Sequence, residues 1–324
     1  MKPLVSVIIP THNRCRYLSE AVDSVLAQTY PHLEIFIVDD GSTDDTPQVL
    51  EKYGNKIKYL RQECRGVCVA RNNAIRQAAG KYVAFLDDDD VWLPQKLEKE
   101  VAFLESHEDH GFVFSSFRYF SDEKADMGER RRNEYEEMTY EYLYNQNLIF
   151  STSLVTMRKE CLDRFGLFDE GLVQSADYDL WLRIAKNCKF GVIDEPLSKY
   201  RLHETNMSKN LARRIKAHKQ IFNKPEIREG KNWLQRRIRF ARLHYFIAHF
   251  SFKYNRYLEA ARHYAVAVFY FPFIGFCYWP PETKGIRFTF VYRILKVYFM
   301  IFYCLFKWIV FPQKDIPSTT FVDV

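Results

Sequence analysis

Four consecutive aspartates, Asp87–Asp90, follow the apolar segment 81–86. Carboxylates at such a position need compensation, because removing each charge from water costs several kcal/mol. One solution is a solvated acidic loop in which Asp90 caps the following helix. The other is a divalent cation that alternate carboxylates hold and that bridges to a diphosphate. The apolar segment before the run, and Trp92 and Pro94 after it, hold the carboxylates rigidly and favour the cation.

Two further polar clusters also follow apolar segments. Thr11–Arg14 come after residues 5–9, and Asp39–Ser42 come after residues 33–38. If the apolar segments are parallel strands, their carboxyl ends meet at one edge of the sheet, where ligands of such sheets bind. The three clusters are therefore expected to form one polar ligand site.

Apolar segments alternate with stretches of helical periodicity between residues 5 and 86. This alternation predicts strand–helix–strand units, and hence an α/β fold with a mostly parallel sheet flanked by helices. Gly80 is expected to cap the C-terminus of a helix. The expected strands are 5–9, 33–38, 57–61 and 81–86, and the expected helices are 14–28, one from about Pro47 to Tyr53, and 67–79.

Five sequence blocks follow one another: VSVIIPTHNR, LEIFIVDDGSTDDT, GVCVARNNAIRQAAGKYVAFLDDDDVWLP, FDEGLVQSADYDLWLRIA and YRLHETNMS. In order and spacing they resemble the family 2 glycosyltransferases of the GT-A type, and the resemblance covers residues 4–208. It implies a GT-A-like, Rossmann-type fold. It also implies that a sugar passes from a nucleotide-diphosphate donor to a hydroxyl acceptor with inversion at the anomeric carbon. The last two blocks are similar to the family's acceptor-side helix and closing segment.

The resemblance assigns nucleotide-sugar contacts to the first two polar clusters. Pro10, Thr11, His12 and Asn13 are expected to line the base and ribose, with loop capping as the alternative for His12. Asp40 matches the position that pairs with the base. Because a carboxylate accepts the N3–H of uracil, a UDP-sugar is the favoured donor.

The resemblance also implies contacts on the phosphate side. Arg71 matches a nucleotide-facing position, and its forked guanidinium suits phosphate; the alternative is a surface salt bridge. Asp88 looks like the ribose contact. Asp89 looks like the direct ligand of a Mn²⁺ or Mg²⁺ cofactor, with Asp87 as the outer member of the pair. His203 matches a position that can reach the metal or diphosphate, and a packed or surface imidazole is its alternative.

A general base must take the proton of the acceptor hydroxyl, and Asp177 and Asp179 in SADYDLW are the candidates. Two residues apart on a helix, they point in different directions. Asp177 shares a face with Trp181 and lies at the helix start, where the dipole favours the ionised form. It also matches the family's base, although Ala176 replaces the Glu that many members have there. Asp177 is therefore the expected base, with helix capping as the alternative.

Residues 121–149 are polar at first and then rich in tyrosine. A segment of this length between elements is typical of a functional or a disordered loop. It is expected to be an acceptor-binding lid whose rings stack on sugars; a solvated surface with a short amphipathic helix is the alternative. The candidate rings are Tyr135, Tyr140, Tyr142 and Tyr144.

The 324-residue chain has two regions of opposite charge. Residues 211–324 carry 20 Lys and Arg against six Asp and Glu, a net charge of +14, while residues 1–210 sum to −8. The expected domains are a catalytic domain at 1–210 and a helical tail at 211–324. Within the first, a nucleotide-sugar half covers about 1–110 and an acceptor half about 111–210. The tail has no recognisable nucleic-acid-binding motif, so nucleic acid is not an expected partner.

The tail also holds 28 of the 53 aromatic residues, and its apolar run 297–311 contains one charge, Lys307. Fifteen residues fall short of the ~20 that span a bilayer. An interfacial helix in peripheral contact with a membrane is expected; a helix buried against the catalytic domain is the alternative. The seven Cys include no CxxC pair and the N-terminal apolar run breaks at Pro10, which favours the cytoplasm, at the inner face of the membrane.

The sequence therefore predicts an inverting, metal-dependent glycosyltransferase that acts on a saccharide or lipid-linked acceptor in surface polysaccharide or glycolipid assembly. Two alternatives stay open. A metal-dependent nucleotidyltransferase using the same carboxylates would release pyrophosphate and would lack the SADYDLW base. A non-catalytic nucleotide-sugar-binding protein would bind the donor without turnover.

Overall fold

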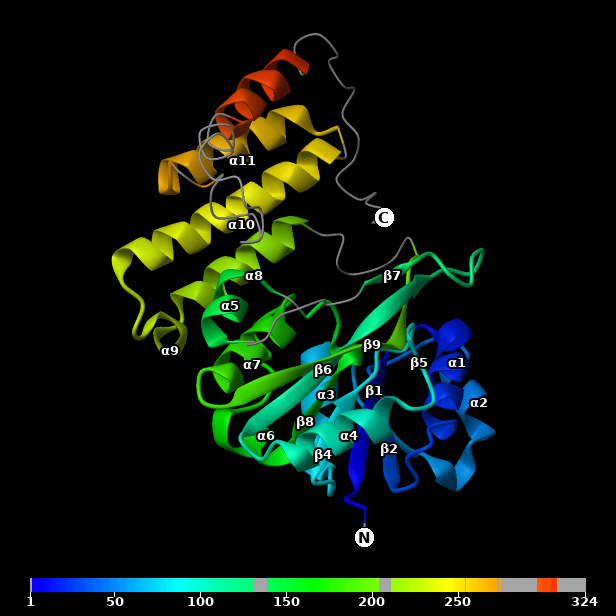
Figure 1. Ribbon diagram of the computed structural model, residues 1–324. Coiled ribbons are helices and arrows are strands. Elements are labelled where there is room, and N and C mark those ends of the chain that lie inside the picture. The colour runs from blue at the N-terminus through cyan, green and yellow to red at the C-terminus, as the bar shows by residue number, and fades with distance from the viewer. Residues whose placement is uncertain are drawn as a thin grey trace. The chain divides into compact units, whose positions relative to one another are not determined.

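The computed structural model describes residues 2–130, 139–147, 149–203, 211–253, 255–272, 274 and 296–307. The chain forms two compact units, Met1–Asn206 and Met207–Val324 (Figure 1). The first unit contains every residue for which the sequence predicts chemistry.

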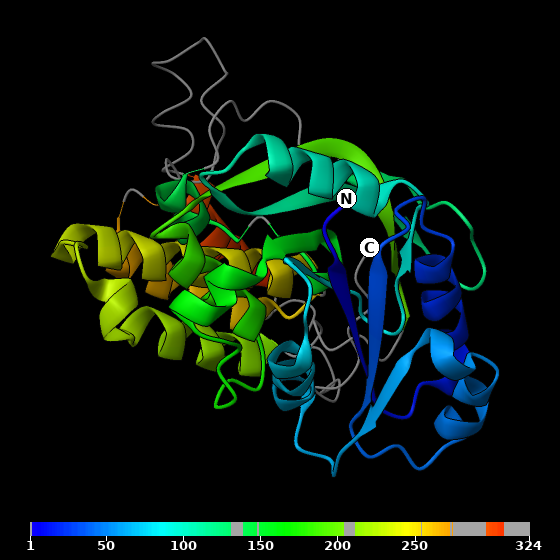
Figure 2. The ribbon, with the colours of Figure 1, turned by 90° about the horizontal axis from the view of Figure 1, so that it is seen from below.

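The first unit is built on one sheet with helices on both faces (Figure 2). Its strands are β1 Val5–Thr11, β2 Leu33–Asp39, β3 Lys58–Arg61, β4 Tyr82–Phe85, β5 Val91–Trp92, β6 His110–Phe120, β7 Glu129–Arg130, β8 Val155–Arg158 and β9 Lys189–Arg201. The strand order is β3-β2-β1-β4-β8-β6-β9-β5, and β7 pairs with β6. The four N-terminal strands pair in parallel, whereas β8 runs antiparallel to both β4 and β6.

The predicted α/β fold is confirmed. All seven residues of β1 are buried, as expected of a central strand covered by helices on both sides. The parallel pairing predicted from the alternating pattern holds for β1 to β4, and the other half of the sheet is mixed. The helices are α1 Cys15–Leu26, α2 Thr46–Glu51, α3 Val67–Gln77, α4 Lys96–Ser106, α5 Tyr140–Asn145, α6 Lys159–Phe165 and α7 Ala176–Ala185, with 3₁₀ turns η1 Gly54–Lys56 and η2 Thr152–Leu154.

Gly80 does not cap α3, contrary to the prediction. The helix ends at Gln77 with Ala78 in the cap position, and Gly80 is not among the residues with positive φ. Instead, Gly80 packs against β1, where an added Cβ would lie 2.6 Å from Ser6 Oγ and 2.7 Å from Ser6 N. Glycine is required here because the two segments approach closely, not because the backbone turns.

The tyrosines of the predicted lid have different environments. Tyr144 is buried, and the Tyr178 hydroxyl donates to Leu143 O at 2.7 Å where α5 packs on α7. The ring of Tyr144 therefore belongs to the core and cannot stack on a sugar, so this part of the prediction is wrong. Tyr140 and Tyr142 are partly exposed, and Tyr135 lies outside the described residues.

The second unit is helical. Its helices are α8 Leu211–Asn223, α9 Pro225–Arg228, α10 Trp233–Lys253, α11 Tyr257–Tyr270 and a helix over residues 296–307. α10 and α11 form a hairpin whose contact is rich in alanine, including Ala241, Ala248 and Ala260. No helix in the described parts of the chain is long and apolar enough to cross a bilayer.

The helix over residues 296–307 covers most of the apolar run predicted to be interfacial; residues 308–311 lie outside the described residues. Val297 and Cys304 join the alanine-rich cluster, so one side of this helix packs within the second unit. Phe299, Phe302 and Phe306 are 62%, 71% and 58% exposed. The helix is thus a packing element on one side and an aromatic surface on the other.

Candidate active site

The ends of β1, β2 and β4 bring together the three polar clusters. Thr11 is in register with Asp39, and Asp40 N donates to Thr11 O at 2.9 Å. On the other side of β1, Leu86 N donates to Ile8 O at 3.0 Å. The loops after these three strands therefore begin side by side, as expected from a parallel arrangement.

The loops after β1 and β2 are tied to each other. His12 Nδ1 lies 2.8 Å from Asp40 O, and Asn13 N donates to Ser42 Oγ at 3.0 Å. Asn13 Oδ1 accepts from Thr43 N at 2.7 Å, with Asn13 at φ 54°, a region that asparagine tolerates better than most residues. These contacts give His12 the loop-capping role that the sequence left open for it.

Asp40 lies at the predicted edge, and its carboxylate already organises the turn before α3. Oδ1 accepts from Gln62 Nε2 and from Arg65 N, both at 2.8 Å. Oδ2 accepts from Gly66 N, also at 2.8 Å. A carboxylate has about four lone-pair positions, so one on Oδ2 remains for a ligand N–H. An open pocket of about 530 Å³ lies beside it and is lined by Gly41, Arg61, Gln62, Glu63 and Cys64.

The neighbouring Asp39 has a structural role that the sequence did not indicate. It is fully buried and accepts from Ser42 N and from the Tyr59 hydroxyl, both at 2.7 Å. Burial and this hydrogen bond raise the pKa of Tyr59 to about 12. Asp39 thus fixes the β2 end of the site.

Arg71 is buried, so the alternative of a surface salt bridge is wrong. Its Nη2 lies 2.5 Å from Asp87 Oδ1 and donates to Thr152 Oγ1 at 3.0 Å. Asp87 also accepts from Ser151 Oγ at 3.2 Å and from Thr152 Oγ1 at 2.9 Å. Arg71 Nε is buried and has no hydrogen-bond partner among the described residues.

Asp89 and His203 meet at this edge although 114 residues separate them in the sequence. His203 Nε2 lies 2.8 Å from Asp89 Oδ2, and the ring of His203 stacks on Tyr17 at a centroid distance of 5.4 Å. The guanidinium of Arg14 forms an ion pair with the same Asp89 oxygen. One carboxylate oxygen therefore has an imidazole and a guanidinium as its partners.

The carboxyl groups of Asp88, Asp89 and Asp90 differ in how burial and neighbouring charges shift their pKa values. Burial, together with the charge of Asp89, raises the pKa of Asp88 to about 7, and the same two causes raise the pKa of Asp90 well above its usual value. Burial also opposes ionisation of Asp89, but the hydrogen bond with His203 and the charge of Arg14 outweigh it and lower its pKa. Of these three carboxyl groups, Asp89 is the one whose ionised form its neighbours favour.

Asp90 does not cap the next helix, contrary to the sequence-based alternative. α4 begins at Lys96 with Gln95 in the cap position. The Asp90 carboxylate is buried and accepts from Ser153 Oγ at 2.6 Å and from Arg201 N at 3.1 Å. It is a support for the loop rather than a solvated group.

The three predicted metal ligands do not form one cluster. Asp89 and His203 meet, whereas Asp87 is paired with Arg71. Within the described ranges, no group of three or more His, Cys, Asp and Glu side chains could hold a metal ion. Asp89 could supply one oxygen ligand and His203 one nitrogen ligand to a divalent cation. Mn²⁺ and Mg²⁺ in enzymes commonly take their remaining ligands from substrate phosphates and water. The pair therefore fits a cation that protein and sugar donor hold jointly.

The two acidic candidates for the general base differ in environment. Asp177 lies in the first turn of α7 and is partly exposed. Burial raises the pKa of Cys68 on α3 to about 11, and the charge of Asp177 adds to this shift, so Asp177 lies near Cys68. Asp179 is fully buried, and it accepts from Arg183 Nε at 3.0 Å. Asp177 is thus the more exposed of the two carboxyl groups.

Sequence reasoning assigned no individual role to two arginines of the site, although it placed Arg14 in the Thr11–Arg14 cluster. Arg14 contacts Asp89, and Arg201 Nε donates to Asp89 O at 2.9 Å. Both stand next to singled-out residues, Arg14 after Asn13 and Arg201 two positions before His203, and this proximity was the available signal. Ser151 and Ser153 carried no comparable signal.

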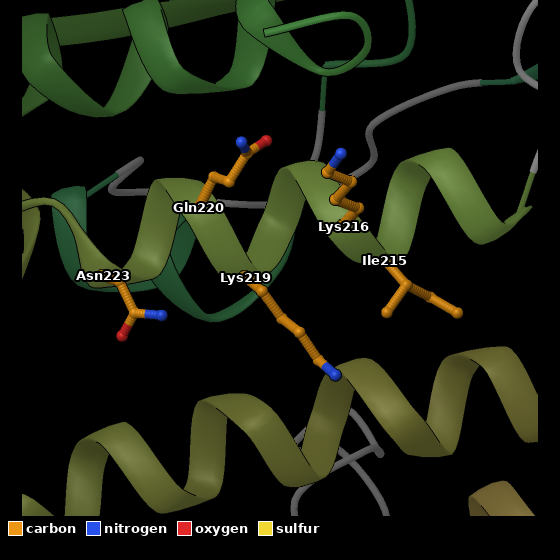
Figure 3. A pocket seen from close by; sticks show the side chains of 5 residues that line it. All are labelled: Ile215, Lys216, Lys219, Gln220 and Asn223. Atoms are coloured by element: carbon orange, nitrogen blue, oxygen red, sulfur yellow. The ribbon is translucent and has the colours of Figure 1, made fainter.

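A further pocket of about 620 Å³ lies on α8 in the second unit (Figure 3). Its lining contains no carboxylate, hydroxyl, thiol or imidazole, so we assign no chemistry to it. The residues are Ile215, Lys216, Lys219, Gln220 and Asn223.

Comparison with known proteins agrees with this geometry. Residues 6–166 match the family described as Glycosyl transferase family 2. The chain is 32% identical over 217 residues to the Escherichia coli UDP-Glc:alpha-D-GlcNAc-diphosphoundecaprenol beta-1,3-glucosyltransferase WfgD, covering 66% of this chain and 83% of the relative.

Two solved structures share the fold. S. aureus TarS 1–349 in complex with UDP-GlcNAc has a TM-score of 0.65 at 20% identity, over 98% of this chain and 96% of that one. The mannosyltransferase PcManGT from Pyrobaculum calidifontis, in complex with GDP-Man and Mn²⁺, has a TM-score of 0.60 at 21% identity, over 96% and 87% of the two chains. The predicted GT-A-like architecture with a helical C-terminal region is thereby confirmed, and the chain is a glycosyltransferase that belongs to glycosyl transferase family 2.

Proposed function

We propose that this enzyme transfers a sugar from a UDP-sugar to a hydroxyl of a saccharide or lipid-linked acceptor, with inversion at the anomeric carbon. The observation that carries the proposal is the convergence of Asp89 and His203, 2.8 Å apart, on the sheet edge that also holds Asp40 and Asp88. The relative WfgD is named for a UDP-sugar donor and a diphosphoundecaprenol acceptor. Assembly of a surface polysaccharide or glycolipid is the corresponding role.

The nucleotide is placed along the ends of β1 and β2. The remaining lone pair of Asp40 accepts the N3–H of uracil, which selects UDP. Pro10, Thr11, His12 and Asn13 form the adjacent wall for base and ribose, held to the β2 loop by the bonds of His12 and Asn13. The related structures with UDP-GlcNAc and GDP-Man support a nucleotide-sugar donor in this fold.

The diphosphate and ribose are placed at the end of β4. Asp88 contacts the ribose, and Asp89 and His203 hold the divalent cation, Mn²⁺ or Mg²⁺. When bound, the cation neutralises charge on the departing diphosphate. Arg71 pairs with Asp87 and adds a positive charge beside the end of β4.

Asp177 takes the proton of the acceptor hydroxyl. It sits in the first turn of α7, where the positive end of the helix dipole favours negative charge. Its partial exposure leaves it accessible to an acceptor, unlike Asp179, which Arg183 engages inside the protein. One base and a direct displacement account for inversion.

The second unit attaches the enzyme to the cytoplasmic face of a membrane. Residues 211–324 carry the net charge of +14, which attracts anionic head groups. Phe299, Phe302 and Phe306 are spaced three and four residues apart on one helix face and are exposed, a pattern suited to the lipid–water interface. A lipid-linked acceptor would be reached from this position.

Thermal unfolding of the full chain with a panel of nucleotides tests the proposal. A ligand that binds only the folded state raises the midpoint, so UDP with Mn²⁺ should raise it more than GDP or ADP with Mn²⁺, and more than UDP in EDTA. Product anomericity, read by NMR, tests inversion, and retention would contradict it. Release of pyrophosphate instead of UDP would show a nucleotidyltransferase.

A further inference from the structure

Arg14 lies where a divalent cation would have to bind. Its Nη1 contacts Asp89 Oδ2 and lies 3.2 Å from His203 Nε2. Its Nε lies 3.9 Å from Asp88 Oδ1. A single guanidinium thus reaches both groups of the proposed metal site at once.

A cation at this place competes with Arg14 for the same atoms. Metal binding uses the Asp89 oxygen to which Nη1 donates, and it uses the unprotonated Nε2 of His203. The side chain of Arg14 is only 21% exposed, and a guanidinium keeps its charge at any ordinary pH. Arg14 therefore cannot yield by losing its proton and must move away from Asp89.

The sugar donor offers a displaced Arg14 a new partner. A diphosphate carries oxygens in the geometry that guanidinium groups recognise, and the proposed diphosphate position adjoins Asp89. Without a nucleotide, a bound cation removes Arg14 from the Asp89 carboxylate and supplies no new anionic partner for the guanidinium. With a nucleotide, Arg14 leaves the Asp89 carboxylate and pairs with the diphosphate.

We infer that Arg14 is a built-in counter-ion of Asp89 that couples divalent-cation binding to sugar-nucleotide binding. It weakens binding of the cation alone and favours binding of cation and nucleotide together. The inference rests on the proposed function for its metal and its nucleotide, and it assigns Arg14 a positioning part rather than a part in the chemical step. Because coupling between two ligands is reciprocal, the same residue also makes UDP binding more dependent on the metal.

Mn²⁺ binding to the full chain, measured by electron paramagnetic resonance with and without saturating UDP, tests this without any turnover. Arg14→Gln should bind Mn²⁺ alone about tenfold more tightly than the wild type, and UDP should then improve Mn²⁺ affinity by a smaller factor than in the wild type. Arg14→Lys keeps the charge and should stay close to the wild type, which separates an effect of charge from an effect of folding.

Arg16→Gln is the matched control. Arg16 lies two residues away, its side chain is 72% exposed, and it pairs with Asp122 at 2.6 Å. Its loss removes one positive charge from the same segment without touching Asp89, so Mn²⁺ affinity should change little. If Arg14→Gln binds Mn²⁺ alone no more tightly than Arg16→Gln while the wild type binds Mn²⁺ with UDP, the inference fails and the proposed function stands. If the wild type binds no Mn²⁺ even with UDP, both fail.

Discussion

The carboxylate of Asp179 accepts a 3.0 Å hydrogen bond from Arg183 Nε one turn later in α7, inside the protein. Arg183 in turn donates to the backbone oxygen of Leu167 at 2.6 Å. Asp179 therefore anchors α7 to the segment after α6. Its neighbour Asp177, two positions earlier, is partly exposed.

This difference predicts opposite phenotypes for two similar substitutions. Asp177→Asn should lower kcat by ~10²–10⁴, the range for a lost general base, with UDP binding and stability unchanged. Asp179→Asn should instead lower the free energy of unfolding by about 3 kcal/mol, because it breaks an ion pair between a fully buried carboxylate and a largely covered guanidinium. Urea denaturation and steady-state kinetics on both variants make the comparison. The reverse pattern would make Asp179 the base.

Asp89→Asn keeps the size of the side chain and removes the charge shared by His203 and Arg14. Transfer should fall at least ~10²-fold, since a charge that stabilises the leaving diphosphate is lost. The fold should be retained, as judged by circular dichroism. Asp109→Asn is the control, because Asp109 is exposed and pairs with Lys189 at 2.9 Å away from these residues. Full activity of Asp89→Asn in EDTA would remove the metal from the mechanism.

We expect the exposed Phe299, Phe302 and Phe306 to be required for binding of the second unit to lipid bilayers. Because Val297 and Cys304 pack in its core, point substitution is a cleaner test than removing the C-terminal segment. Changing Phe299, Phe302 and Phe306 to Ser should abolish flotation with anionic liposomes at low salt and leave turnover of a soluble acceptor intact. High salt should weaken flotation of the wild type.

A matched triple substitution on the first unit controls for lost apolar surface. Leu26, Met127 and Val173 are also exposed, and changing them to Ser should leave flotation unchanged. Wild-type protein that stays in the supernatant with anionic liposomes at low salt would make the tail a packing element alone.

We expect the free energy of unfolding of the second unit to fall at acidic pH because of His244. Burial, then the neighbours His263 and Lys219, lower the pKa of His244 to about 4; its Nδ1 lies 2.8 Å from His263 Nδ1. The folded state thus keeps this histidine neutral, whereas the unfolded chain protonates it below about pH 6.5. Its contribution to stability is complete above pH 6.5 and is lost as the pH falls toward 4, by up to about 1.4 kcal/mol per pH unit.

The difference in unfolding free energy between the wild type and His244→Gln isolates this effect from other titrating groups. It should favour the wild type at pH 7.5 and shrink steadily between pH 6.5 and 4.5 in urea denaturation followed by circular dichroism. A difference that does not change with pH would contradict the assignment.

What the sequence could predict is what short stretches determine. The strands β1, β2 and β4 stand out because each is an apolar run that ends at polar residues, and the same ends locate Asp40, Asp88 and Asp89. Helical periodicity likewise places α1 and α3 to within a few residues. Because parallel strands end at the same edge of the sheet, the loops that follow them lie close together.

What the sequence could not predict depends on distant partners. Arg71 matched a nucleotide-facing position, yet its partner Asp87 lies 16 residues further on, after a strand. Asp90 looked like a cap because Ser153, its hydrogen-bond partner, lies 63 residues away. Gly80 looked like a turn residue because its contact, Ser6, lies 74 residues earlier on β1. No periodicity within a window of helical length reports such contacts.

The support of Asp90 by Ser153 and by Arg201 N limits how the enzyme can be recombined. Residues 1–110 contain the proposed nucleotide contacts Asp40, Asp88 and Asp89, but in a chimera they would carry a buried carboxyl whose two supports belong to the other parent. We therefore expect that exchanging residues 1–110 alone does not transfer sugar-nucleotide preference from one relative to another. Exchange of donor preference between relatives by domain shuffling requires residues 151–153 and the end of β9 to travel with the first four strands.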